Sequence, residues 1–290
     1  RKTAKGQTMR NTIENKTFDE ERALYNLCDT DVKDCVFAGP ADGESVLKEA
    51  RNIGVEDCSF SLRYPLWHVK KFNMKDSTMD EKTRAAIWYA TDGVIEDSKL
   101  HGIKAVRECS NIHIFSCDIC SPEFGWKCSG LSLKDTSIEA EYAFFDSSDV
   151  HLEDVRLHGK YSFQYVHGLT VSDCILDTKD AFWHSTNITV RDSVVKGEYL
   201  GWFSDGLTLI NCKISGTQPL CYCKNLKLIN CTMEDTDLSF EYSDVDADVV
   251  GSIMSVKNPR SGVIVCDGVG EIISEDPVME CSGKVVIREK

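Results

Sequence analysis

NITVRDSVV (187–195), GLTLINCKI (206–214) and NLKLINCTM (225–233) follow one another at intervals of 19 residues and share one pattern. Each begins with a turn residue, alternates aliphatic and other residues, passes an Asp or Asn followed by a small residue, and ends on an aliphatic residue. A repeat of about 20 residues with apolar residues at every second position is typical of a solenoid, because one unit cannot bury its own apolar face. The repeat therefore predicts the architecture before any functional motif is considered.

The Asp or Asn position extends this repeat along most of the chain. It reads Asn15, Asp34, Asp57, Asp76, Asp97, Ser116, Asp135, Asp154, Asp173, Asp192, Asn211 and Asn230. Three residues after it comes an apolar column: Phe18, Phe37, Phe60, Met79, Leu100, Ile119, Ile138, Leu157, Leu176, Val195, Ile214 and Met233. Only the steps from 34 to 57 and from 76 to 97 exceed 19 residues, and loops can absorb the excess. We expect about twelve coils, with the Asp and Asn residues at equivalent turns.

The repeat predicts strands rather than helices. Aliphatic residues alternate with polar ones at a period of two, and 19 residues are too few for a strand plus a helix. Because parallel connections are almost always right-handed, the predicted fold is all-β: a single-stranded right-handed parallel β-helix. We expect a flexible N-terminal segment over residues 1–14, the β-helix over 15–262, and a C-terminal cap over 263–290, where the repeat becomes irregular.

Composition argues against two classes of partner. The formal net charge of −14 disfavours nucleic acid and anionic membrane surfaces, both of which are bound through basic patches. No apolar run approaches the roughly 20 residues that cross a bilayer. We therefore expect neither nucleic acid nor membrane as a partner, and the oligomeric state is open.

The fourteen cysteines raise the question of disulfides or metal ligands. Six of them follow the Asp or Asn of their unit: Cys35, Cys58, Cys117, Cys174, Cys212 and Cys231. Ser or Thr takes the same position in other units, which indicates a small inward residue, so we expect mainly free thiols and a cytoplasmic protein. Zinc-type pair spacing is missing, and so is the glycine-rich nonapeptide of calcium-binding β-rolls. We predict no metal and no cofactor.

All five tryptophans occupy one further column, ten residues after most of the Asp or Asn positions. It reads Tyr25, Lys48, Trp67, Trp88, Arg107, Trp126, Phe145, Gln164, Trp183, Trp202, Cys221 and Phe240. Lys48, Arg107 and Gln164 would be costly inside a narrow dry coil, so we expect this column to face outward. The preceding column, with Leu66 and Phe182 among its members, is then the buried one. The alternative is an aromatic ladder that only stabilises the solenoid.

The position after the tryptophans carries titratable groups, and together the two columns form our candidate site. Aromatic rings beside hydrogen-bonding groups suit a carbohydrate or another small polar ligand. The predicted ligand-binding residues are Trp67, His68, Trp88, Arg107, Trp126, Trp183, Trp202 and Glu241. If catalysis occurs, His184 and Asp146 are the candidates for acid–base roles, since both lie beside the aromatic column.

Several segments resemble a family of uncharacterised bacterial proteins with right-handed, pectate-lyase-like β-helices. They are EERALYN (20–26), DGESVLKEARNI (42–53), YPLWHVKKF (64–72), RAAIWYAT (84–91), KDAFWHS (179–185), GEYLGWFS (197–204), FEYSDVDADV (240–249) and SVKNPRSG (255–262). The resemblance runs from about residue 15 to 275 and implies the fold. It implies no reaction, because that family has no established activity.

Two classes of function remain open at this point. The first is a carbohydrate-active enzyme, either a glycoside hydrolase with paired carboxylates or a polysaccharide lyase in which a cation such as Arg107 opposes a uronate. The second is a non-catalytic solenoid that binds a glycan or a protein along the aromatic column.

Overall fold

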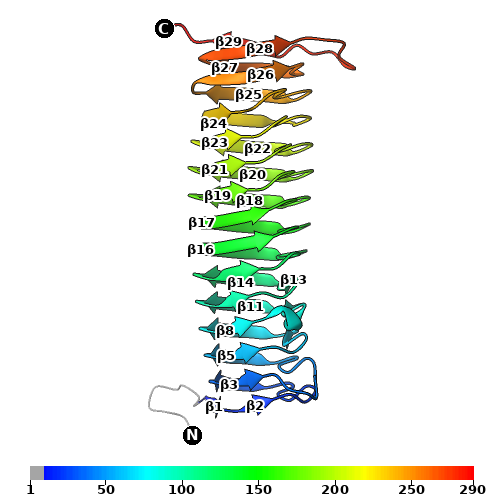
Figure 1. The fold of residues 1–290 in the computed structure, drawn as a ribbon, viewed down its shortest axis with the longest axis vertical. Helices are drawn as coiled ribbons and strands as arrows, with labels where there is room; N and C mark the ends of the chain where they lie inside the picture. The colour runs from blue at the N-terminus through cyan, green and yellow to red at the C-terminus, as the bar shows by residue number, and fades with distance from the viewer. Residues whose placement is uncertain (1–9) are drawn as a thin grey trace. The chain divides into compact units, whose positions relative to one another are not determined.

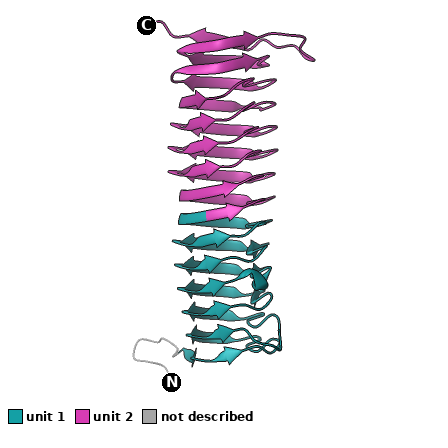
Figure 2. Ribbon diagram, viewed as in Figure 1, with its two compact units in different colours: residues 1–137 teal, residues 138–290 magenta. Residues whose placement is uncertain are grey.

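The computed structural model describes residues 10–290 and divides into two compact units, Arg1–Ser137 and Ile138–Lys290 (Figure 2). Each unit is a stack of parallel β-coils (Figure 1). The only helical element between residues 10 and 290 is the 3₁₀ turn η1 (Glu81–Thr83). No helix in that range is long and apolar enough to span a bilayer. The predicted all-β, right-handed parallel β-helix is confirmed.

Each coil of the first unit contributes a long strand and a short one, and three coils add a strand at the tryptophan column. The long strands are β1 (Asn11–Glu14), β3 (Cys28–Lys33), β5 (Arg51–Glu56), β8 (Lys70–Lys75), β11 (Thr91–Glu96), β14 (Ser110–Phe115) and β16 (Ser129–Ala140), in which the unit boundary falls. The short strands are β2 (Thr17–Phe18), β4 (Val36–Phe37), β6 (Ser59–Phe60), β9 (Thr78–Met79), β12 (Lys99–Leu100) and β15 (Asp118–Cys120). The third set is β7 (Leu66–Trp67), β10 (Ile87–Trp88) and β13 (Val106–Arg107).

The second unit repeats this plan and continues it to the C-terminal end. Its strands are β17 (Ser148–Gly159), β18 (His167–Ser172), β19 (Ile175–Asp177), β20 (Thr186–Arg191), β21 (Val194–Lys196), β22 (Asp205–Ile210), β23 (Lys213–Ser215), β24 (Leu226–Glu234), β25 (Asp244–Val249), β26 (Ser252–Lys257), β27 (Ser261–Cys266), β28 (Gly268–Ile273) and β29 (Lys284–Ile287). Equivalent residues pair across coils, as Ile188 does with Leu207.

The number of coils corrects our expectation of twelve, because the structure has about fifteen turns. The additional turns come after Asn230, where the Asp and Asn pattern stops but parallel pairing continues from β25 to β27 and from β27 to β29. Residues 263–290, expected as a cap, therefore contain further paired strands. At the other end, β1 lies within the segment 1–14 and pairs with β3, whereas residues 1–9 lie outside the described residues.

The Asp and Asn column forms the turns between long and short strands. All twelve residues adopt left-handed backbone, with φ between 48° and 54°. Asn and Asp tolerate this conformation better than other non-glycine residues because their short side chains bond locally. Neighbouring members also bond to each other, since Asn211 Nδ2 donates to Asp192 Oδ1 at 3.1 Å and Asn230 Nδ2 donates to Asn211 Oδ1 at 2.9 Å. The column is thus a hydrogen-bonded turn scaffold.

The small-residue column just after these turns is buried for a reason that goes beyond size. In the second unit, the backbone N–H of Cys174 donates to Ser193 Oγ of the next coil at 3.1 Å. Ser193 Oγ in turn donates to Arg191 O at 2.7 Å, and Cys174 Sγ contacts Ser172 O at 3.1 Å. Hydroxyl and thiol groups can both accept and donate a hydrogen bond. Ser, Thr and Cys can therefore replace one another at this position and satisfy buried backbone groups. The six cysteines of this column are buried free thiols.

Candidate functional site

The five tryptophans of the column face outward, as predicted, whereas its last two members, Cys221 and Phe240, are buried. In β7 and β10, Leu66 and Ile87 are fully buried, whereas the next residues, Trp67 and Trp88, are only half-buried. In the second unit, Phe182 is fully buried and Trp183 is half-buried in the same way. In the extended strands β7 and β10, successive residues point to opposite sides, which places Leu66 and Ile87 in the core and the tryptophans outside it. The preceding column is therefore the buried one.

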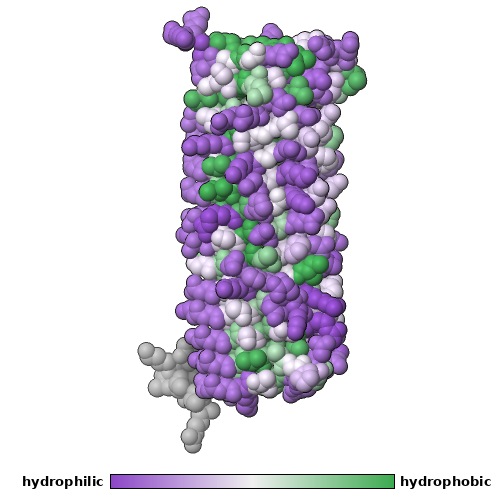
Figure 3. Space-filling view, in the orientation of Figure 1, coloured by the Kyte–Doolittle hydropathy of each residue, from purple (hydrophilic) through white to green (hydrophobic). Residues whose placement is uncertain are grey.

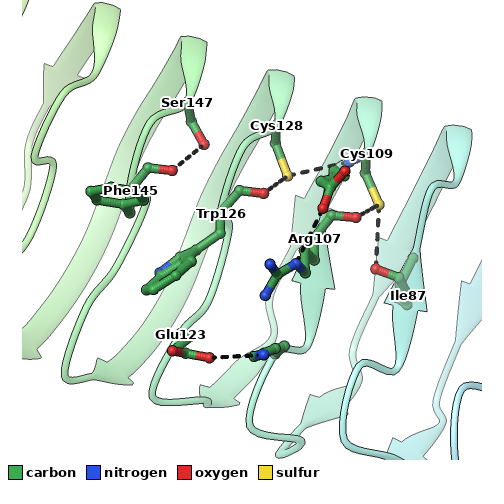
Figure 4. Close-up of polar contacts among 10 residues, drawn as sticks. Ile87, Arg107, Cys109, Glu123, Trp126, Cys128, Phe145 and Ser147 are labelled. Carbon is green, nitrogen blue, oxygen red and sulfur yellow. Dashed lines mark hydrogen bonds and ion pairs between the residues drawn. The ribbon is translucent and has the colours of Figure 1, made fainter.

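The indoles of the first unit stack on each other and on cations. The rings of Trp67 and Trp88 lie 5.5 Å apart at an interplanar angle of 9°. Lys48 Nζ lies 4.6 Å from the ring centre of Trp67, and the Arg107 guanidinium lies 5.7 Å from that of Trp126. Arg107 and Trp126 leave neighbouring coils on the same side (Figure 4). Arg107 thus makes a cation–π contact with Trp126, and Trp67, which contacts Lys48 and Trp88, offers a ligand mainly its edge.

The indoles of the second unit are fixed still more firmly. Trp183 and Trp202 stack at 5.6 Å with an interplanar angle of 5°. Trp183 Nε1 donates to Tyr199 O at 3.2 Å, and Trp202 Nε1 donates to Gln218 O at 2.8 Å. One face of each indole and both Nε1 groups are thus engaged within the protein. The faces by which Trp183 and Trp202 stack on each other are therefore closed to a sugar ring.

The position after each tryptophan forms a second, outer ladder. His184 lies between Tyr165 and Phe203, with ring separations of 5.1 and 4.9 Å and interplanar angles of 6° and 5°. Phe203 continues to Tyr222 at 4.8 Å. All four residues have left-handed backbone, with φ from 52° to 60°, so the chain turns at this position and the side chain projects away from the core. Tyr165 and Phe203 are 44% and 42% exposed.

In the first unit the outer ladder borders a polar pocket of about 360 Å³, which we call the Glu49 pocket. Its lining residues are Asn26, Glu49, Arg51, His68 and Lys70. Glu49 accepts a hydrogen bond of 2.6 Å from the Tyr25 hydroxyl, which raises the pKa of Tyr25 above 10.0 because the neighbouring carboxylate favours the neutral phenol.

Two further contacts hold the side chains that line the Glu49 pocket in place. The Arg51 guanidinium donates to Asn26 Oδ1 at 3.4 Å, and His68 stacks on Tyr89 at 4.9 Å. The outward side chains of three successive coils are thereby held at defined positions. Of the residues predicted from sequence, His68 is the one that lines this pocket.

The other predicted residues are placed differently. His184 and Asp146, the catalytic candidates, share the outer column of the second unit, but Tyr165 occupies the coil between them. Glu241 pairs with Lys257 at 3.1 Å, which raises the pKa of Lys257. Arg107 Nε pairs with Glu108 at 3.3 Å. His184, Asp146, Glu241 and Arg107 are not among the residues that line the Glu49 pocket. The roles of His184 and Asp146 stay predictions.

Sequence reasoning missed Asn26, Arg51 and Lys70. Arg51 and Lys70 are the first residues of β5 and β8, two positions beyond the outer column, whereas Asn26 lies in the outer column itself, directly after Tyr25. The signal available was a basic residue at the first position of two consecutive long strands. Within residues 10–290, no group of three or more His, Cys, Asp or Glu side chains is arranged to hold a metal ion.

Comparisons with known proteins identify a family but no activity. A family model described as a protein of unknown function, DUF3737, matches residues 11–287. No curated protein matches the chain. The chain is similar in structure to the A-module of mannuronan C-5 epimerase AlgE6 from Azotobacter vinelandii, with a TM-score of 0.37, 10% identity and coverage of 97% of this chain and 90% of that one.

Two further structures are similar at the same level. PfbA, a surface adhesin of Streptococcus pneumoniae, has a TM-score of 0.36 and 8% identity, with 95% of this chain and 85% of that chain covered. The catalytic domain of a GH87 α-1,3-glucanase also has a TM-score of 0.36 and 8% identity, with 97% and 64% covered. Likenesses this distant carry no inference about what this chain binds.

Proposed function

Because the chain belongs to the DUF3737 family, whose function is unknown, we propose a function from its geometry: it binds a carbohydrate at the Glu49 pocket. The observation that supports this is the pocket itself, in which Glu49 and His68 project from adjacent coils beside a wall of stacked rings. Its volume of about 360 Å³ falls in the range of small-ligand sites.

The lining favours a sugar that carries a carboxylate. Glu49 and the Asn26 amide can accept hydrogen bonds from hydroxyl groups, whereas Arg51, Lys70 and His68 can donate them. Arg51 and Lys70 outnumber Glu49, so the pocket has a positive local charge within a chain of net charge −14. An Arg fork matches a carboxylate in bidentate geometry. A uronate therefore suits this lining better than a neutral sugar.

If the ligand is also converted, the lining favours elimination over hydrolysis. Hydrolysis by the usual route needs two carboxyl groups about 5–10 Å apart, and Glu49 is the single carboxylate among the lining residues. Elimination needs a base for the proton next to the uronate carboxylate and a cation that stabilises the resulting charge. As the C=C bond forms, the C–O bond on the neighbouring carbon breaks, and the leaving oxygen takes a proton, which Lys70 can supply. Glu49 or His68 can serve as the base, and Arg51 or Lys70 as the cation.

Titration with galacturonate and with galactose tests the proposal, with calorimetry and tryptophan fluorescence as readouts. The fluorescence should respond because Trp67 lies 5.8 Å from His68. We expect saturable binding of galacturonate, weaker binding of galactose, and at least tenfold weaker galacturonate binding in His68→Ala. His113→Ala, an outward histidine on β14 of the same unit, is the matched control and should bind normally. Equal affinity in wild type and His68→Ala would refute the assignment.

A second candidate function, protein binding, is favoured by the outer ladder of the second unit. Tyr165 and Phe203 expose large aromatic surfaces in one stacked row, and exposed Tyr and Phe are common in protein interfaces. The double variant Tyr165→Ser with Phe203→Ser discriminates the two functions. Loss of a protein partner with unchanged galacturonate binding would favour this second function.

A further inference from the structure

A basic pocket lies in the first unit where the 19-residue repeat is interrupted. The pocket has a volume of about 530 Å³ and is lined by Gly39, Pro40, Asp42, Arg63, Lys82 and Arg84. The two coil steps longer than 19 residues, from Asp34 to Asp57 and from Asp76 to Asp97, contain the segments 39–42 and 82–84 that form its wall. Insertions in solenoids map to loops, and those loops often carry the binding site.

The first inserted loop is held in place by Asp19 of the preceding coil. Ala41 N donates to Asp19 Oδ2 at 3.0 Å, and Gly43 N donates to Asp19 O at 2.8 Å. Gly39 has φ of 150°, and a Cβ there would lie 2.5 Å from Asp19 Oδ2. Only glycine fits this close approach, so the loop is a formed wall rather than a loose insertion.

The second wall presents Arg84 from an unusual backbone. Arg84 follows η1 with φ of 56° and ψ of −96°, a combination that is rare and strained for a residue with a Cβ. Hydrogen bonds hold it there, because Arg84 N donates to Glu81 O at 3.3 Å and Lys104 N donates to Arg84 O at 2.9 Å. Strain of this kind is retained where the surrounding structure fixes it, and such positions cluster at ligand sites.

The charges around the pocket leave two cations without a counterion. Arg63 is shared by Asp42 at 3.8 Å and Glu44 at 3.4 Å. Of the nearby acidic groups on η1, Asp80 accepts hydrogen bonds from Ser61 Oγ and Lys82 N, and Glu81 faces His101 at 4.0 Å. Lys82 and Arg84 have no ion pair with any residue between 10 and 290. Two positive charges therefore face the pocket.

We propose that this pocket binds a tetrahedral oxyanion with a charge of about −2, the phosphate monoester group of a small molecule. Two unpaired cations match a charge of −2, and a guanidinium fork beside an ammonium is suited to such oxyanions. A chain of net charge −14 repels large polyanions, which restricts the ligand to a small molecule. This site is separate from the Glu49 pocket, with which it shares no lining residue.

Calorimetric titration with inorganic phosphate, inorganic sulfate and acetate at constant ionic strength tests the inference. We expect saturable binding of phosphate and sulfate, with acetate at least tenfold weaker. Arg84→Gly should weaken phosphate and sulfate binding at least tenfold, and glycine accepts the positive φ, so the fold is kept. Lys99→Gln, an exposed lysine on β12, is the matched control and should bind as wild type.

Three results would overturn the inference: no saturable binding of phosphate or sulfate, equal phosphate affinity in wild type and Arg84→Gly, or acetate affinity equal to that of phosphate. Circular dichroism of each variant monitors folding. If Arg84→Gly fails to fold, Lys82→Gln replaces it, with the same expected loss of affinity. None of these variants changes the Glu49 pocket, so galacturonate binding should be the same in all of them.

Discussion

At the scale of single residues, the same few roles recur in every coil. Asp or Asn takes the left-handed turn, a small hydroxyl or thiol residue accepts a buried backbone N–H, and aliphatic or aromatic residues fill the core. These roles leave only outward positions for chemistry, and that is where Tyr25 and Glu49 form their hydrogen bond of 2.6 Å. Two predictions belong to this scale.

The first concerns the turn column. Asp192 has φ of 51° and accepts a hydrogen bond from Asn211. Asp192→Ala and Asp192→Gly both lose that bond, but only alanine must then hold its Cβ in the left-handed region, which costs about 1 kcal/mol. We expect Asp192→Ala to be less stable than Asp192→Gly by about this amount in urea unfolding. Equal stabilities would mean that the turn relaxes and that Asp is not there for its backbone conformation.

The second concerns Tyr25 at alkaline pH. The Glu49 carboxylate raises the pKa of Tyr25 in the folded protein above its unfolded value of 10.0. The stabilisation from this pair is therefore complete below pH 10 and is lost as pH rises through the folded pKa. A hydrogen bond to Glu108 raises the pKa of Tyr89, and burial raises that of Tyr222, so phenolate absorbance should show a late-titrating fraction that falls by one tyrosine in Glu49→Gln. An unchanged tyrosine titration curve in Glu49→Gln would contradict the prediction.

At the scale of elements, the stacked ladders divide into a buried type and an exposed type. Phe144, Phe163 and Phe182 stack at 5.2 Å and are fully buried, whereas Tyr165 and His184 stack at 5.1 Å in the outer ladder. The sequence could predict which column is buried, because charged residues interrupt the outward one. It could not predict that the indoles would cover each other's faces, since this depends on the ring orientation in successive coils.

A pair of substitutions two residues apart measures the difference between the ladders. Phe163→Ala removes a ring from the core and leaves a cavity, which should cost about 3–5 kcal/mol. Tyr165→Ala removes a ring that is 44% exposed and should cost less than about 1.5 kcal/mol. Both positions have positive φ, 63° and 56°, so backbone effects are matched. Urea unfolding of the two variants checks this prediction, and similar losses would show that the outer ladder carries much of the stability.

At the scale of the molecule, regularity made the fold predictable and irregularity placed the pockets. Eleven Asp or Asn residues and one Ser at equivalent positions, with a matching apolar column, were sufficient for the parallel β-helix. The Glu49 pocket and the basic pocket both lie among coils with irregular spacing. The lining of the Glu49 pocket takes repeat positions, with Glu49 one coil before His68 and Arg51 one coil before Lys70, whereas the lining residues of the basic pocket follow no repeat. Such residues can be recognised only when the coils are assembled. The face seen in Figure 3 is mostly hydrophilic, in agreement with the net charge of −14.

The last prediction concerns the thiols, because their column runs through both units. Burial raises the pKa of Cys58 and of Cys174 to about 11, so these thiols are protonated and shielded at neutral pH. In native protein at pH 8, we expect exposed thiols such as Cys28 to react with a disulfide reagent within minutes, and the six column thiols to react only as the coils open.

In denaturant without reductant, most of the fourteen cysteines should react. Mass spectrometry of partly labelled native protein then distinguishes two modes of opening. If each unit opens as a whole, the column thiols of that unit become labelled together. Labelling of single column thiols one at a time would instead show that individual coils open independently, as nearest-neighbour coupling in a repeat protein permits. Finding three or more disulfides in the denatured, unreduced protein would contradict the assignment of these cysteines as mainly free thiols.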